Sequence, residues 1–292
     1  MALAIDVGGT KLAAGLVTVD GEVLSESAVP TPSQGDSEKL FSILQALLER
    51  VQGDREVVVC GVGCGGPMTG GGELVSPLNI GAWPSFPLRS RLAAAIGRPT
   101  FVDNDAKALA LAEGWRGAAR GETDFLAMVV STGVGGGIVL DGRLLDGSDG
   151  NAGHIGHVIV EPEGHMCPCG ARGCLEAEAS GTAIAAITGR PAEEAGPDVI
   201  AMVGTMVGRA VGSVANLLDL RSALVGGSVA LGFGEPFFTA AQAEIDARAL
   251  LAFSSDARIA PVGLGRSGPL VGAAAVGWRG LGHRLLGPAG SP

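Results

Sequence analysis

One pattern constrains the fold of this chain more than any other, and it occurs twice: an apolar strand, a glycine-rich turn and a second apolar strand. The first copy occupies residues 3–19, with Gly8-Gly9-Thr10-Lys11 at its centre. The second occupies residues 125–140, with a glycine-rich segment that begins at Ser131. Each copy is typical of a β-hairpin. The copies share their order of elements but not their sequence, so they indicate two structurally related halves rather than a sequence repeat.

The rest of the chain alternates between strands and helices. The turn Asp20-Gly21 and a strand at 23–29 extend the first hairpin into an antiparallel meander. Apolar residues at helical spacing predict helices at about 37–51, 88–96, 106–118, 197–219, 235–251 and 268–281. Shorter apolar runs predict strands at 57–62, 100–102 and 223–225 and near Ile259. This alternation is typical of an α/β protein.

The length of 292 residues is enough for two domains. We expect a small N-terminal α/β domain of residues 1–106 together with about 268–283, and a larger α/β domain of residues 107–267. A cleft would separate the two halves. Residues 284–292 are expected to form a disordered tail.

Composition and charge argue against several classes of protein. Hydrophobic residues make up 47% of the chain, which allows a substantial core, and the net charge of −10 argues against nucleic-acid partners. The most apolar run, at about 199–218, is interrupted by Arg209 and Asn216, so we expect a buried helix rather than a membrane span. No basic and apolar leader precedes the first strand, so we expect a cytoplasmic protein without membrane partners.

Both glycine-rich turns are candidates for binding phosphate. The first follows Asp6 and consists of Gly8, Gly9, Thr10 and Lys11, and the second contains Thr132, Gly133, Gly135 and Gly136. Glycine lets backbone N–H groups approach an anion, hydroxyl and ammonium groups add donors, and the Asp6 carboxylate can hold Mg²⁺. Either turn alone could be a hairpin that merely needs glycine, but two together suit a nucleotide held from two sides. Neither matches the Walker A pattern.

A further polar segment, Asp103-Asn104-Asp105, lies between a short strand and a helix. A carboxylate at a strand end is suited to act as a general base, but an aspartate there equally suits the N-cap of the helix. Two other glycine-rich turns, Gly61–Pro67 and Gly226-Gly227, follow apolar strands. Both would let the backbone approach a ligand, and both are equally compatible with plain turns.

The strongest local signal is a cluster of thiols preceded by imidazoles. The residues concerned are Cys167, Cys169 and Cys174, with His154, His157 and His165 upstream. Three thiolates and one imidazole fit a tetrahedral Zn²⁺ without an open position, which predicts a structural metal. The spacing leaves open which histidine completes the site. Cys60 and Cys64 follow an apolar pattern and are expected to be small buried residues.

Taken together, these motifs resemble the ROK family of sugar kinases and sugar-responsive repressors. The resemblance runs from Asp6 to about Gly277 and is most specific in the cysteine segment. Its pieces are Asp6–Lys11, Gly61–Pro67, Asn104-Asp105-Ala106, Gly133–Gly137, Gly153–His157, Cys167–Glu176 and Gly226-Gly227. The resemblance implies an actin-like (ribonuclease H-like) two-domain ATPase fold, with ATP and a hexose in the interdomain cleft.

The resemblance also implies roles for individual residues. Asp105 would be the catalytic base that takes the proton from the sugar 6-hydroxyl as it receives the γ-phosphoryl of ATP. Asp6 would face Mg²⁺, and His157 would complete the structural Zn²⁺ site. The sugar would contact Gly65, Gly66, Asn104, Asp105, His154, His157 and Glu176. The nucleotide would lie among Gly8, Gly9, Thr10, Lys11, Thr132, Gly133, Gly135 and Gly136, with Gly226 and Gly227 beside the adenosine.

Two positions depart from the family pattern. Glucokinase-like members usually carry a sugar-contacting Glu where this chain has His154, so N-acetylmannosamine or another amino sugar is an alternative to glucose. Many members carry an aromatic residue where this chain has Glu178. A sugar-binding regulator without a DNA-binding domain is the non-enzymatic alternative. By analogy with the family, we expect a homodimer or homotetramer.

Overall fold

The computed structural model describes residues 1–32 and 36–287. The chain divides into two compact units. The first contains Met1–Gly121, Leu144–Ala152 and the chain from Leu264 onward, and the second contains Glu122–Arg143 and Gly153–Gly263. The division does not fall at the expected boundaries after residues 106 and 267, because the helix that follows residue 104 belongs to the first unit. Residues 288–292 of the expected tail lie outside the described residues.

The first unit is built on a five-stranded sheet with the strand order β3-β2-β1-β4-β5. The carboxyl ends of its parallel strands lie at the same edge of the sheet. The strands are β1 (Ala2–Val7), β2 (Lys11–Val17), β3 (Val23–Pro30), β4 (Val59–Cys64) and β5 (Thr100–Asn104). β1, β2 and β3 pair antiparallel, which confirms the predicted meander, whereas β4 and β5 run parallel to β1. Asp6, Cys64 and Asn104 therefore lie at the same edge of the sheet.

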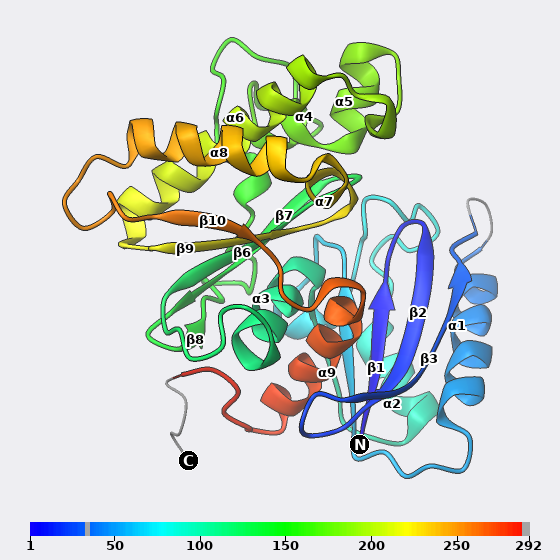
Figure 1. The fold of residues 1–292 in the computed structure, drawn as a ribbon. Coiled ribbons are helices and arrows are strands. Elements are labelled where there is room, and N and C mark those ends of the chain that lie inside the picture. Colours follow the sequence, from blue (N-terminus) through cyan, green and yellow to red (C-terminus); the bar gives the residue numbers. More distant parts are fainter. Residues whose placement is uncertain (33–35, 288–292) are drawn as a thin grey trace. The chain divides into compact units, whose positions relative to one another are not determined.

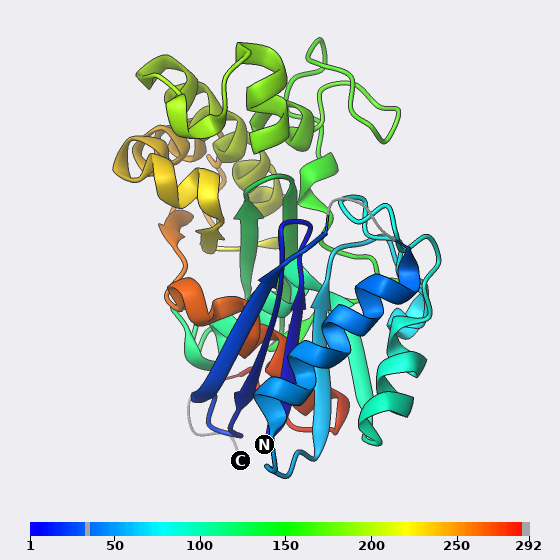
Figure 2. The same cartoon turned by 90° about the vertical axis from the view of Figure 1, so that its right-hand side faces the viewer.

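Helices cover both faces of this sheet (Figure 1, Figure 2). α1 (Ser37–Gln52) and α2 (Leu88–Ile96) share a hydrophobic core with one face. α3 (Asp105–Arg116) and α9 (Gly268–Gly280) lie against the other face and against each other. α9 approaches β4 closely because Gly61 has no side chain: a Cβ there would lie 1.9 Å from the carbonyl oxygen of Ala273.

The second unit is built on a sheet of the order β10-β9-β6-β7-β8. Its strands are β6 (Phe125–Val130), β7 (Val134–Leu140), β8 (Arg143–Leu144), β9 (Ser222–Gly226) and β10 (Arg258–Pro261). β6 and β7 pair antiparallel, and β9 and β10 continue the sheet in parallel from β6. α6 (Pro197–Leu218) and α8 (Glu235–Arg248) pack together over this sheet (Figure 1).

The two sheets have the same strand order. In each, the first strand pairs antiparallel with the next strand of the chain on one side and parallel with a later strand on the other side. This confirms that the chain consists of two related halves. The turn between β7 and β8 also matches the prediction, because Asp141 and Gly142 both have positive φ angles, 51° and 67°. Two consecutive left-handed residues are the signature of the hairpin turn that suits the twist of the flanking strands.

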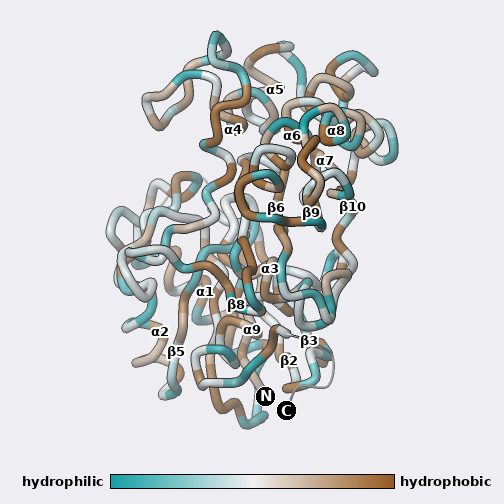
Figure 3. Tube along the Cα trace, turned by 90° about the vertical axis from the view of Figure 1, so that its left-hand side faces the viewer, coloured by the Kyte–Doolittle hydropathy of each residue, from teal (hydrophilic) through white to brown (hydrophobic). Residues whose placement is uncertain are grey.

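α6 is long and apolar enough to cross a membrane by length and composition alone. However, 56% of its most apolar window is buried inside the protein, and Val203, Val207 and Ala210 belong to the core of the second unit. Leu126, Met128 and Val130 of β6 belong to that same core. Figure 3 shows the chain trace coloured by hydropathy, with β6 and α6 labelled. α6 is therefore a core helix, as its interrupted apolar pattern predicted.

Three short helices follow no pattern that we could read in the sequence: α4 (Leu175–Ala179), α5 (Gly181–Thr188) and α7 (Ser228–Phe233). Single 3₁₀ turns occupy Gly70–Gly72, Ile155–His157, Ala192–Glu194 and Gly265–Ser267. The short helices matter for function, because α4 follows directly on the last cysteine of the thiol cluster.

Candidate active site and metal centre

The first glycine-rich turn joins β1 to β2. Its Gly8 N–H donates to the carbonyl of Lys11 at 3.0 Å, and the hydroxyl of Thr31 donates to the Gly8 carbonyl at 2.7 Å. Gly9 is exposed, yet a Cβ there would lie 2.5 Å from the Cβ of Asn79, so no larger residue fits without movement. Asn79 lies in a long loop and belongs to no motif that would have marked it in the sequence.

Asp6 lies at the carboxyl end of β1, opposite Gly63 of β4. Its pKa is raised to about 6, mainly by burial and next by the charge of Asp105, whereas Lys11 acts in the opposite direction. Burial and the same two carboxylates raise the pKa of the Cys64 thiol well above its ordinary value. Two carboxylates whose charges act on each other create a negative potential that favours a bound cation. Cys60 and Cys64 are both buried thiols, as expected. Burial raises the pKa of Cys60 to about 12.

The segment Asp103-Asn104-Asp105 spans the junction of β5 and α3. The Asn104 side-chain oxygen is the N-cap, accepting from the N–H groups of Ala106 at 3.0 Å and Lys107 at 3.4 Å. The Asp105 carboxylate also accepts from the Ala106 N–H, at 2.9 Å. The capping role that we weighed for an aspartate is therefore filled by Asn104, and Asp105 occupies the first helical position.

Asp103 belongs to a charge network of the first unit that sequence analysis missed. The Lys107 ammonium, almost fully buried, lies 3.0 Å from Asp103 and 2.9 Å from Asp146. Arg279 of α9 pairs with the same two carboxylates. Burial raises the pKa of Asp103, and Lys107 and Arg279 oppose that rise. Only the four-residue spacing of Asp103 and Lys107 was a local signal for this network.

The second glycine-rich turn is held inside the second unit. We call residues 131–137 the second glycine loop. The Ser131 carbonyl accepts from the Gly181 N–H at 2.7 Å, and the Thr132 carbonyl accepts from the Thr182 hydroxyl at 2.9 Å. The Val134 N–H donates to the Glu176 carboxylate at 3.0 Å. The loop is thus attached to α4 and to the start of α5.

Gly226 and Gly227 lie next to this loop. Gly227 has a φ of 98°, and a Cβ there would lie 2.3 Å from the Val130 carbonyl, immediately before the second glycine loop. The hydroxyls of Ser131 and Ser228 are 3.0 Å apart. The structure therefore brings together two of the segments that were assigned to the nucleotide.

Gly65 and Gly66, which were assigned to the sugar, lie in the loop of the first unit after β4, where the Gly66 carbonyl accepts from the Leu78 N–H at 3.3 Å.

The thiol cluster is assembled as one site: ligand atoms of His157, Cys167, Cys169 and Cys174 all lie within 4.8 Å of one another. In a tetrahedral zinc site with Zn–S bonds of about 2.3 Å, neighbouring sulfurs are about 3.8 Å apart. The sulfurs of Cys169 and Cys174 are 3.7 Å apart, and the Cys167 sulfur is 3.7 Å from His157 Nδ1. The residues therefore fit a structural Zn²⁺.

The structure also decides among the three histidines. His165 donates elsewhere: its backbone N–H and its Nδ1 lie 2.5 Å and 2.8 Å from the two carboxylate oxygens of Glu178. The ring of His154 is 6.1 Å from that of His157, and in the described part of the chain the cluster includes His157 alone of the three. Glu178, for which the resemblance offered no role, is thus a buried acceptor for the loop that carries the cysteines.

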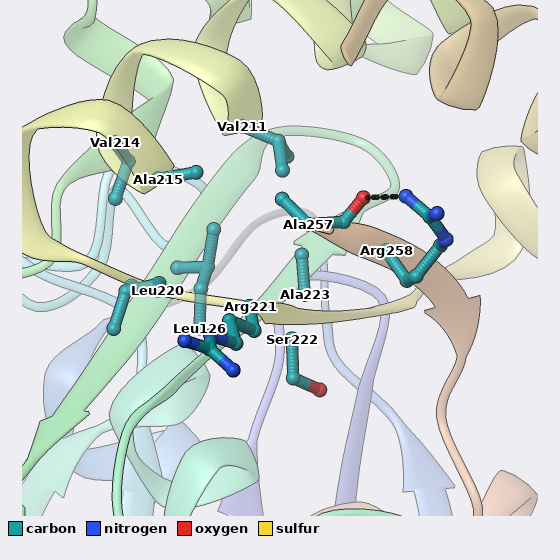
Figure 4. Close-up of a pocket in the computed structure, with 10 residues that line it drawn as sticks. All are labelled: Leu126, Val211, Val214, Ala215, Leu220, Arg221, Ser222, Ala223, Ala257 and Arg258. Carbon is teal, nitrogen blue, oxygen red and sulfur yellow. Dashed lines mark hydrogen bonds between the residues drawn. The ribbon is translucent and has the colours of Figure 1, made fainter. Parts of the chain in front are cut away.

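A small pocket of the second unit is not part of this chemistry (Figure 4). It is lined by apolar side chains of β6 and α6 together with Ser222, Arg221 and Arg258. Ser222 and Arg258 are the first residues of β9 and β10, so the pocket lies at the opposite end of β9 from Gly226. It has room for about one water molecule, which is too little for a sugar or a nucleotide.

Two units with one strand order, each with a glycine turn after its first strand, define the class of the fold: it is the two-domain actin-like ATPase fold. A model of the ROK family matches residues 2–278. The chain therefore belongs to the ROK family.

Individual relatives support this assignment. An N-acetylmannosamine kinase of Escherichia fergusonii is 38% identical over 248 residues, covering 80% of this chain and 84% of that protein. The structure of a ROK hexokinase from Thermus thermophilus matches with a TM-score of 0.84 and 34% identity, over 96% of this chain and 99% of that one. A ROK family glucokinase from Streptomyces griseus, solved with glucose and AMPPNP, matches with a TM-score of 0.83 and 28% identity, over 95% and 99%.

Proposed function

We propose that the protein is an ATP-dependent sugar kinase that transfers the γ-phosphoryl group to the 6-hydroxyl of a hexose. The observation that carries the proposal is the pair of carboxylates at one edge of the first sheet, Asp6 and Asp105, in the same unit as the turn Gly8–Lys11. Transfer of a phosphoryl group needs a cation, donors for the phosphates and a base for the attacking hydroxyl. The kinase names of the relatives agree with this assignment.

In this proposal Asp105 is the general base. Asp103, the other candidate, is committed to Lys107 and Arg279, so its charge is already used within the fold. Asp105 would accept the proton of the sugar hydroxyl. A Mg²⁺ ion held near Asp6 would neutralise charge on the phosphates. Asn104 uses its amide oxygen as a helix cap, so its NH₂ group is the part that would donate to a sugar oxygen.

The remaining proposed contacts follow the motifs of the family resemblance. The turn Gly8–Lys11 would hold phosphate oxygens, Thr132–Gly136 would contact the nucleotide, and Gly226-Gly227 would lie beside the adenosine. Gly65, Gly66, His154, His157 and Glu176 would contact the sugar. His157 Nδ1 lies 3.7 Å from the Cys167 sulfur, which would leave Nε2 for the sugar.

His154 favours an amino sugar over glucose as a second candidate substrate. The glutamate usual at this position can only accept hydrogen bonds, whereas an imidazole can donate one to the carbonyl oxygen of a 2-acetamido group. N-acetylmannosamine and other 2-acetamido sugars are therefore included as acceptors. We further propose that the protein is cytoplasmic and forms a homodimer or homotetramer, which sedimentation analysis would measure.

The test is ADP release from Mg²⁺–ATP with glucose, mannose, N-acetylmannosamine, N-acetylglucosamine and kanosamine. Loss of a general base predicts a decrease in kcat of about 10²–10⁴-fold for Asp105→Asn. Asp54→Asn, at an exposed aspartate of the first unit, serves as the control and should keep full activity. His154→Glu should shift preference toward glucose. Sugar binding without turnover on any acceptor would refute the kinase and leave a sugar-binding regulator.

A further inference from the structure

α4 carries two glutamates that reach different parts of the second unit. The helix begins at Leu175, directly after the metal ligand Cys174, and contains Glu176 and Glu178. Residues two positions apart on an α-helix do not face the same way. Glu178 contacts residues 161–174, which we call the metal loop, while Glu176 contacts the second glycine loop.

Glu178 holds the metal loop with both of its oxygens. Its side chain is only 6% exposed, and it accepts from the backbone N–H and the Nδ1 of His165 at 2.5 Å and 2.8 Å. Gly164 lies so close that a Cβ there would be 2.2 Å from a Glu178 oxygen. Cys167 follows two residues after His165. A buried carboxylate without hydrogen-bond donors lowers stability, so this contact fixes the part of the metal loop that carries Cys167.

The other side of α4 holds the second glycine loop. Glu176 accepts the Val134 N–H at 3.0 Å, and a Cβ at Gly133 would lie 2.9 Å from the same carboxylate oxygen. The residues after α4 add the contacts of Gly181 and Thr182 to the carbonyls of that loop. A shift of α4 would therefore displace several of the bonds that hold residues 131–134.

We propose that Glu178 is a positioning residue that couples the metal loop to the second glycine loop through α4. The coupling to nucleotide rests on the proposed function, which assigns the second glycine loop to ATP. Glu178 and the metal ligand Cys174 hold α4 from two points, and Glu176 then keeps the Val134 N–H in place. Without Glu178, the metal is released faster and the second glycine loop loosens.

The experiment compares Glu178→Ala, Glu178→Gln and His165→Ala with the parent, using Glu163→Ala, an exposed position of the same loop, as control. Three quantities are measured: zinc release to a chelator, amide hydrogen exchange, and affinity for Mg²⁺–AMPPNP by calorimetry. For Glu178→Ala we expect zinc release about 10-fold faster, an effect at the lower end of what the loss of outer-shell support causes at metal sites. We also expect faster exchange in residues 131–134 and about 10-fold weaker AMPPNP binding.

The conservative variants separate positioning from general damage. Glutamine keeps an oxygen that accepts the His165 N–H, so Glu178→Gln should recover most of the loss. His165→Ala keeps the backbone N–H and should give an intermediate effect, and because His165 is exposed this variant carries the test if Glu178→Ala does not fold. Faster zinc release with unchanged exchange at 131–134 would overturn the coupling. If exchange changes as expected but the parent binds no AMPPNP, the coupling stands and the proposed function fails.

Discussion

Replacing Asp6 with asparagine is expected to stabilise the protein while it removes a group that the proposed reaction needs. The fold raises the pKa of this carboxyl from 3.8 to about 6, chiefly by burying it and next by placing it near Asp105. That rise corresponds to about 3 kcal/mol of folding free energy lost when the group is ionised. Asparagine has a similar shape and no charge, so Asp6→Asn should recover much of this energy at neutral pH.

The gain should depend on pH in a defined direction. The folded protein holds the Asp6 proton more tightly than the unfolded chain, so the stability it contributes is fully present below pH 3.8 and is lost as the pH rises through about 6. The advantage of Asp6→Asn over the parent should therefore reach about half of its full size at pH 5 and nearly all of it at pH 8.

The assay is urea denaturation at pH 5 and pH 8, in Mg²⁺-free and nucleotide-free buffer with zinc retained. Tryptophan fluorescence is a suitable signal, because Trp83, Trp115 and Trp278 all lie in the first unit with Asp6. Asp54→Asn, at an exposed position, should change stability little at either pH. An Asp6→Asn protein that is no more stable at pH 8, or whose gain is the same at both pH values, would refute the reasoning.

Two further substitutions test the packing of the first unit in the same titration. Gly61→Ala should cost about 3 kcal/mol or more, because its Cβ would overlap the Ala273 carbonyl at 1.9 Å. Gly81→Ala, at an exposed position of the first unit with no neighbour within 4 Å, should change stability little, and equal effects would contradict the packing argument. Lys107→Met leaves the buried Asp103 carboxylate with Arg279 as its remaining cationic partner, beside the backbone N–H of Asn104, and should destabilise by roughly 3–5 kcal/mol. A neutral result would mean that the network contributes little.

Local patterns predicted most of the framework, because the main elements of each sheet carry their own periodicity. The helix at 88–96 has the expected bounds, and the Asp141-Gly142 turn follows from its residue types alone. The short helices α4 and α5 have too few turns to show a periodic pattern. Their conformation depends on contacts made elsewhere, such as the bonds from Gly181 and Thr182 to the second glycine loop.

In the candidate site too, some residues could be predicted from local patterns and others depend on distant contacts. Cysteine spacing predicted the metal ligands, because a closed tetrahedral site needs few residues at short separation. The exclusion of His165 depended on Glu178, which holds its ring, and the exclusion of His154 depended on which ligand atoms the fold gathers. Likewise, Asp103 is committed by Arg279, 176 positions away in the sequence. Competition for a partner is a property of the folded chain, so no motif could have revealed it.

The two halves share a backbone plan but not a chemistry, and one pair of positions shows how. Asp6 is the penultimate residue of β1 and lies opposite Gly63 of the neighbouring parallel strand. In the second unit the corresponding position is Val129, the penultimate residue of β6, opposite Gly226. A glycine lies opposite the penultimate residue of the strand in both halves. Of the two penultimate residues, Asp6 carries a carboxylate and Val129 does not. Because a buried charge lowers stability wherever it does not bind something, a second copy at Val129 would add cost without adding a second cation site. The two halves therefore share their order of elements but differ in the residues at this position.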